Sequence, residues 1–300
     1  MQTIKIIIVL LCLTVSNIFA QNQVDVIFLT DYYKSYLEAA KSSKNENEVY
    51  SSIVQMPIYE KYFSKTEYAP FVLEDLKSEQ IDNTQLMKKI EGIASNKDEI
   101  ETIISSSVKK SYSSIPLAKL KVYILPTKGE LNFMSESMSG IYGLTAGNDA
   151  ILISIDTSQN GWKKMLPYAI AHEYYHAYWT KENYHKLTGW NLLDFLCFEG
   201  RADYFAKQLY PDVKTPWTEA LSKKDEDTLW KTISPDLYNQ DFDFMLNVMF
   251  GSEEYPKWGG YSLGYTITNK ALQEENKLTI NEWTNLHPTG LLSLSGFQTN

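Results

Sequence analysis

Two histidines and a glutamate stand close together in the stretch AHEYYHAYW, which covers residues 171–179. The chain contains only 4 histidines among 300 residues, and His172 and His176 are two of them. Residues four apart lie on one face of a helix, so both imidazoles can offer a ring nitrogen to one ion, and neutral imidazole suits zinc. Glu173, about 100° further round such a helix, can reach a water on the open side of the metal and act as a general base. The stretch therefore predicts a hydrolytic zinc centre.

A catalytic zinc ion needs a third protein ligand, and the following helical stretch, FEGRADY (198–204), offers one. Glu199 and Asp203 are four apart, so they share one face of a helix that is otherwise apolar there. Two acids on a stripe that faces the core would cost several kcal/mol unless they were paired or bound to a metal. We expect Glu199 to be the third zinc ligand and Asp203 to be the acceptor that orients a ligand histidine. The alternative is that Glu199 and Arg201 are ordinary surface charges.

Peptide hydrolysis also requires a donor that shares the charge of the tetrahedral oxyanion with the metal. Tyr261 is our candidate, because the glycines of the stretch GGYSLGY (259–265) let the start of a helix approach the site closely. A packing role is the competing interpretation, since the chain has 21 tyrosines. His287 and His185 are the other residues considered for this role.

The pattern HExxH followed by ExxxD on the next helix resembles the gluzincin superfamily, which includes thermolysin-like peptidases and zinc aminopeptidases. The matching residues are His172, Glu173, His176, Glu199 and Asp203. The chain lacks the Gly-Ala-Met-Glu-Asn segment of the aminopeptidases, so the resemblance favours an endopeptidase.

A narrower resemblance links the chain to a bacterial family of predicted zinc-dependent proteases, domain of unknown function 2268. The stretches that carry it are AHEYYHAY (171–178), FEGRADYFA (198–206) and GGYSLGYTI (259–267). It extends from about Leu120 to the C-terminus. It implies a zinc metallopeptidase of the gluzincin type, with Zn²⁺ as cofactor and a peptide or protein as substrate.

The elements that must position these residues follow from periodicity and from breaker residues. Residues 31–114 show helical spacing of apolar side chains. Strands are expected at 120–125, 140–145 and 150–155, with a turn at 146–149. Helices are expected at 165–180, 191–210, 215–222, 237–250, 261–273 and 280–286, the last opened by the capping box of Thr279 and Glu282. The fold class is α+β, mainly helical, with a small sheet that precedes the two metal-ligand helices. Either 140–145 or 150–155 could be an edge strand that pairs with an extended substrate.

The N-terminus has the three-part layout of a secretory signal peptide. It contains the basic Lys5, the apolar run IIIVLLCLTV (6–15) and a small residue for cleavage, Ala20. The apolar run is short for a membrane anchor, which is the alternative. We therefore expect a secreted or periplasmic protein with no membrane span after cleavage. The predicted organisation is a signal peptide at 1–20, an N-terminal helical region at 21–115 and a zincin-like metallopeptidase domain at 116–300.

Composition limits the classes of function. The formal net charge of -9 argues against nucleic acid as a partner, and 44% hydrophobic residues are normal for a globular protein. Loss of Cys12 with the signal peptide would leave Cys197 alone, so no internal disulfide is expected. Two alternatives to a zinc peptidase remain: a degenerate zincin fold that serves as an extracytoplasmic binding module, and a zinc hydrolase of non-peptide amides. The intact Glu173 favours an enzyme over a binding module.

Overall fold

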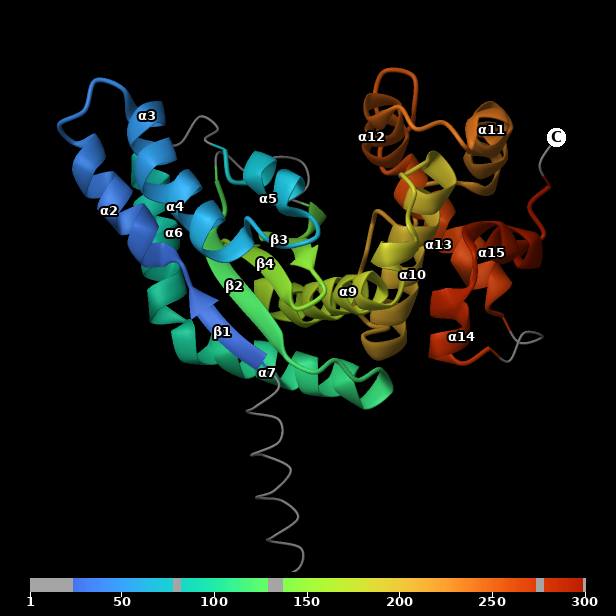
Figure 1. The fold of residues 1–300 in the computed structure, drawn as a ribbon, viewed down its shortest axis with the longest axis horizontal. Coiled ribbons are helices and arrows are strands. Elements are labelled where there is room, and N and C mark those ends of the chain that lie inside the picture. The colour runs from blue at the N-terminus through green and yellow to red at the C-terminus, as the bar shows by residue number, and fades with distance from the viewer. Residues whose placement is uncertain (1–23, 78–81, 129–136, 274–277, 299–300) are drawn as a thin grey trace, which may run out of the picture. The chain divides into compact units, whose positions relative to one another are not determined.

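The computed structural model describes residues 24–77, 82–128, 137–273 and 278–298, so the predicted signal peptide at 1–20 lies outside the described residues. The chain forms two compact units that meet in sequence between Ile170 and Ala171. This division falls inside α9 (Trp162–Asn183), the helix that carries both histidines of the predicted metal centre. The chain is 62% helical and has one four-stranded sheet in its described part (Figure 1), which confirms the mainly helical α+β prediction.

The first unit contains the sheet, whose strand order is β1-β2-β4-β3. The strands are β1 (Val24–Phe28), β2 (Leu120–Pro126), β3 (Ile141–Gly147) and β4 (Ala150–Ile155). β1 and β4 run parallel to β2, and β3 is antiparallel to β4. The three predicted strands are present at nearly the predicted bounds. β4 lies between β2 and β3, so the expectation that 150–155 could be an edge strand was wrong, whereas β3 does lie at an edge.

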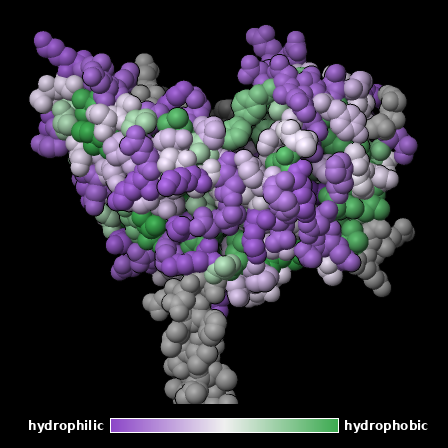
Figure 2. Space-filling view, viewed as in Figure 1, coloured by the Kyte–Doolittle hydropathy of each residue, from purple (hydrophilic) through white to green (hydrophobic). Residues whose placement is uncertain are grey.

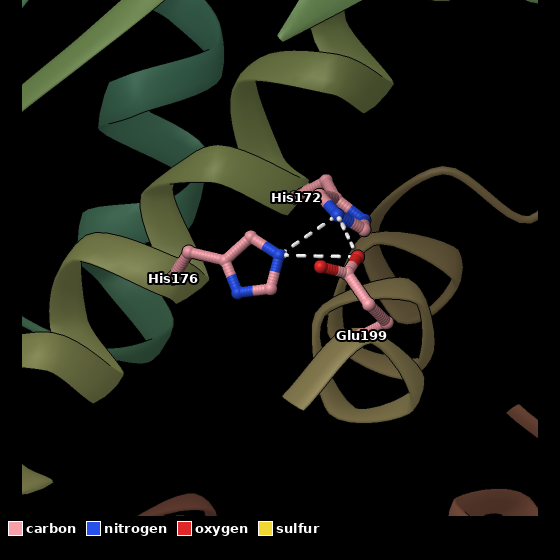
Figure 3. Close-up of side chains that lie close together, drawn as sticks. All are labelled: His172, His176 and Glu199. Carbon is pink, nitrogen blue, oxygen red and sulfur yellow. Dashed lines mark hydrogen bonds and ion pairs between the residues drawn. The ribbon is translucent and has the colours of Figure 1, made fainter. Parts of the chain in front are cut away.

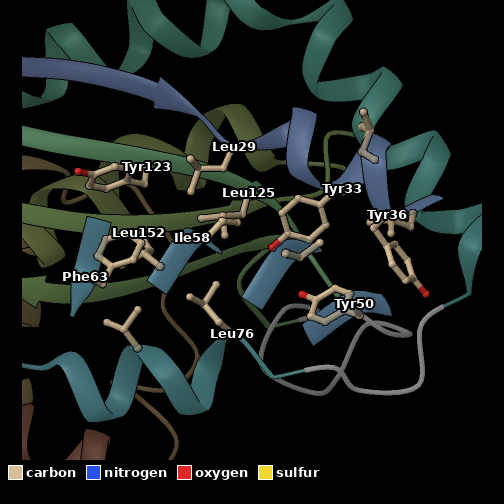
Figure 4. Packing of buried hydrophobic residues seen from close by; sticks show 14 of the residues in the cluster. Leu29, Tyr33, Tyr36, Tyr50, Ile58, Phe63, Leu76, Tyr123, Leu125 and Leu152 are labelled. Carbon is tan, nitrogen blue, oxygen red and sulfur yellow. The ribbon is translucent and has the colours of Figure 1, made fainter. Parts of the chain in front are cut away.

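Helices cover the sheet and bury both faces of its central strands. On one face, Tyr123, Leu125 and Leu152 join a core with helical residues such as Tyr33 and Phe63 (Figure 4). On the other face, Val122, Ile124, Ile151 and Ile153 are fully buried. Strands buried on both faces appear as nearly continuous apolar runs, which is why they could be recognised in the sequence. The helical segments of this unit are α2 (Thr30–Ala40), α3 (Glu46–Tyr50), the π-helix Ser51–Gln55, α4 (Met56–Ile58), the π-helix Tyr59–Phe63, α5 (Ala69–Asp75), α6 (Asn83–Ser95) and α7 (Lys97–Ser114).

The second unit is helical throughout its described part. Its elements after α9 are the 3₁₀ turn Tyr184–Lys186, α10 (Leu192–Leu209), α11 (Lys223–Ile233), the 3₁₀ turn Ser234–Asp236, α12 (Phe242–Phe250), α13 (Gly259–Ala271), α14 (Ile280–Asn285) and α15 (Pro288–Ser295). α10 begins with a capping box in which Asn191 and Asp194 bond to each other's backbone. The predicted capping box of Thr279 and Glu282 opens α14.

Glycines let α10 and α13 cross at close range. A Cβ atom on Gly200 would overlap the backbone of Gly264, and a Cβ atom on Gly264 would overlap the carbonyl of Leu196. Both overlaps are with backbone atoms, which cannot move aside as a flexible side chain can. Only glycine at these two positions therefore lets the backbones of α10 and α13 lie so close together. The crossing fixes α10, the helix that carries Glu199.

One helix prediction in this unit was wrong, and a second gave the right end but the wrong start. Residues 215–222 do not form a helix, because Thr215 and Thr218 bond to each other in a turn and the next helix begins only after its N-cap, Ser222. The helix expected at 237–250 begins at Phe242, where the side chain of Asp241 caps it. The prediction also missed α11 and α15.

The face of the molecule drawn in Figure 2 is predominantly polar. Hydrophilic side chains make up most of the face drawn in Figure 2, with hydrophobic residues in smaller groups. None of the helices in the described part of the chain combines the length and the apolarity that a membrane span requires.

Candidate metal centre

Three side chains from two helices bring their ligand atoms to one point (Figure 3). His172 and His176 come from α9, and Glu199 comes from α10. The Nε2 atoms of the two histidines lie 3.0 Å apart. Oε2 of Glu199 lies 3.3 Å from Nε2 of His172 and 3.4 Å from Nε2 of His176. The sequence prediction that these residues converge is therefore matched by the geometry.

The separations within this triangle suit a tetrahedral zinc ion. Bonds of about 2.1 Å in tetrahedral geometry place two ligand atoms roughly 3.4 Å apart. The three separations of 3.0, 3.3 and 3.4 Å lie close to that value. Two imidazoles and one carboxylate are also the donor set of a catalytic zinc site with three protein ligands. The residues present thus fit a zinc ion.

Asp203 contacts His172 at Nδ1, the ring nitrogen that does not face the other two ligand residues. Its carboxylate is fully buried, and Oδ1 lies 3.2 Å from Nδ1 of His172. A carboxylate only accepts hydrogen bonds, so Nδ1 of His172 is the donor. This bond fixes the imidazole so that Nε2 points toward His176 and Glu199, as a metal ligand must.

His176 is held by stacking. Its ring lies 3.9 Å from the ring of Phe198, at an interplanar angle of 22°. Its buried Nδ1 atom has no hydrogen-bond partner among the described residues. The orientation of this imidazole therefore depends on Phe198, whose role could not be predicted from the sequence.

The electrostatic field at the site favours a cation. Burial alone would lower the pKa of the His172 imidazole, but the Asp203 and Glu199 carboxylates hold it well above its ordinary value, with a further contribution from Glu173. Burial alone would raise the pKa of Glu199, but the imidazoles of His176 and His172 lower it to about 2. Buried carboxylates that favour a proton on imidazole would equally favour a divalent cation between the ligands.

Glu173 follows the first ligand on α9 and is buried. Its charge is one of the causes of the raised pKa of His172, so its carboxylate contributes to the electrostatics of the metal centre. This position is compatible with the predicted general base.

The remaining candidates lie elsewhere in the second unit. The ring of Tyr261 packs against Phe250 and Trp258, and a role for its hydroxyl in catalysis stays a prediction. His185 lies in an exposed 3₁₀ turn, and His287 caps the start of α15. Neither histidine belongs to the cluster of ligand atoms.

Trp217 is a neighbour of the site that its sequence context does not predict. Its indole Nε1 donates to both carboxylate oxygens of Asp203, at 3.0 and 3.1 Å. A single tryptophan in a threonine-rich turn carries no recognisable motif, so only the folded chain reveals this contact.

The comparison with protein families agrees with the geometry. The model of a family described as "Predicted Zn-dependent protease (DUF2268)" matches residues 100–293, which is more than half of the chain. The chain therefore belongs to this family of predicted zinc-dependent proteases. The match contains all three residues of the cluster as well as Glu173 and Asp203. No curated protein and no solved structure is significantly similar to the chain.

Proposed function

We propose that this protein is a zinc-dependent endopeptidase of the gluzincin type. The observation that carries the proposal is the triangle formed by His172, His176 and Glu199, whose edges match those of a tetrahedral zinc site. Membership in a family of predicted zinc-dependent proteases supports the same class of reaction. A zinc ion held there would supply a Lewis acid that polarises the peptide carbonyl and makes water more acidic.

The protein's own residues then have distinct roles. Asp203 keeps His172 in the ligating tautomer. Glu173 accepts a proton from the attacking water, whose oxygen forms a bond to the peptide carbonyl carbon, and passes that proton to the amide nitrogen as the carbon–nitrogen bond breaks. Tyr261 is proposed as the donor to the oxyanion.

The proposed substrate is a peptide or protein outside the cytoplasm, because the sequence begins like a secretory signal peptide. We propose cleavage after Ala20 and a secreted or periplasmic mature chain. Mass spectrometry of the exported protein tests this directly, since a mature chain that still contained Lys5 would refute it.

The test of the proposed function is cleavage of casein by the purified protein with and without a chelator. We expect cleavage that stops on chelation and returns when zinc is added. The Glu173→Gln protein, which keeps the size of the side chain and removes the base, should bind zinc and lose activity by at least about 100-fold. Full activity of a zinc-loaded Glu173→Gln protein would contradict the role of Glu173. Absence of cleavage by zinc-loaded wild type on a broad peptide library would support a binding module instead.

A further inference from the structure

We propose that Trp217 is a positioning residue of the metal centre and acts on zinc affinity through Asp203. The inference rests on the proposed function, because it assumes that His172 binds zinc. Trp217 lies outside both metal-ligand helices, in the segment between α10 and α11. It forms the outermost member of a chain of contacts that runs from Trp217 through Asp203 to His172.

The carboxylate of Asp203 needs donors because it is fully buried. Nδ1 of His172 lies 3.2 Å from Oδ1, and the indole nitrogen of Trp217 lies 3.0 Å from Oδ1 and 3.1 Å from Oδ2. The indole N–H thus donates to both oxygens and restricts the position of the carboxylate. An indole N–H can only donate, so it stabilises Asp203 as an acceptor for His172.

The turn at residues 215–218 holds Trp217 in place. The hydroxyls of Thr215 and Thr218 lie 2.7 Å apart, and the backbone N–H of Thr218 donates to the carbonyl of Thr215. Ser262 of α13 fastens this turn: its hydroxyl donates to the carbonyl of Thr218 and accepts from the N–H of Leu221.

The indole ring itself is buried and packs against another aromatic ring. Trp217 is 3% exposed, and its ring lies 6.4 Å from the ring of Trp258. A buried indole enclosed by a bonded turn has few alternative positions, so its N–H direction is preset before a metal binds. Loss of the N–H should therefore loosen Asp203 and, through it, the imidazole of His172.

The test is the zinc dissociation constant of the full-length protein, measured by competition with a chromophoric chelator. Trp217→Phe keeps an aromatic ring and removes the N–H, and we expect it to weaken zinc binding by about tenfold. Trp230→Phe is the matched control, because Trp230 is also buried and its indole N–H donates to the backbone of Gln298, in contacts unrelated to the metal centre. The control should change the constant by less than about twofold, although both variants lower the unfolding temperature of the zinc-free protein.

A double-mutant cycle shows whether Trp217 acts through Asp203. Asp203→Asn alone should weaken zinc binding, and Trp217→Phe should then add little. Unchanged zinc affinity of folded Trp217→Phe, or fully independent effects of the two substitutions, would overturn the inference. Wild-type protein that binds no zinc would instead refute the proposed function. If Trp217→Phe does not fold, Trp217 can be replaced by benzothienylalanine, which has sulfur in place of the N–H. The zinc dissociation constant of that protein is then compared with that of wild type, and an unchanged constant would overturn the inference.

Discussion

At the residue scale, the ligand residues of the candidate metal centre could largely be predicted from the sequence. The residues that hold these ligands in position could not. Spacing alone predicts that His172 and His176 share a helix face, and the apolar surroundings of Glu199 indicate that its carboxylate must be bound to something. The ring of Phe198 stacks on His176, and the indole N–H of Trp217 donates to Asp203. Neither contact corresponds to a periodic pattern in the sequence. Residues that hold a ligand are thus harder to predict than the ligand.

Arg201 is a second residue whose surroundings could not be predicted from the sequence, and we expect it to contribute to stability. The sequence allowed it to be a surface charge, but its side chain is buried, and Nη2 donates to the carbonyl of Leu286 at 2.6 Å. No carboxylate forms an ion pair with it in the part of the chain that the structure describes. It lies about 200° round α10 from Glu199, hence on another face.

We expect Arg201→Ala to lower the free energy of unfolding by about 2–4 kcal/mol, because it leaves a cavity and an unpaired carbonyl of Leu286. Urea denaturation of the purified protein measures this. Gln208→Ala, an exposed position on the same helix, is the control and should have little effect. Arg201→Ala protein that is as stable as wild type would show that the buried guanidinium contributes nothing net.

At the scale of elements, local patterns in the sequence predicted β2, β3, β4 and most helices, whereas β1, α11 and α15 were missed. β2 and β4 are apolar runs buried on both faces, so the sequence reveals them. β1 pairs with β2, with Val24 opposite Leu120. Because the partner strand lies so far along the chain, no local pattern in the sequence predicts β1. Residues 215–222 carry helix-compatible residues, but threonine hydroxyls stabilise a turn there.

The crossing of α10 and α13 gives a prediction at this scale. Gly264→Ala places a Cβ atom against the carbonyl of Leu196, so the helices must separate. Overpacking of this kind typically costs about 1–3 kcal/mol. Leu196 lies one turn before Glu199, so zinc affinity should fall together with the unfolding temperature.

The control for this prediction is Gly290→Ala in α15. A Cβ atom there meets only the side chain of Leu286, which can move. We expect a change of less than about 1 kcal/mol and unaltered zinc affinity. A Gly264→Ala protein indistinguishable from this control would show that the helices tolerate a wider separation.

At the scale of the whole molecule, the residues of the candidate metal centre all lie in one unit. All three ligand residues follow Ala171, together with Asp203 and Trp217. Cys197 is a buried free thiol, so the described part of the chain is stabilised by its cores and not by a disulfide.

The most direct test of the account is the zinc dissociation constant of Glu199→Ala protein beside wild type. We predict one zinc ion per wild-type chain and an affinity at least about 100-fold lower after loss of the carboxylate ligand. Glu253→Ala, which removes the same charge from an exposed loop, should bind zinc like wild type. Equal zinc affinity of Glu199→Ala and wild type would contradict the claim that two imidazoles and this carboxylate hold the metal.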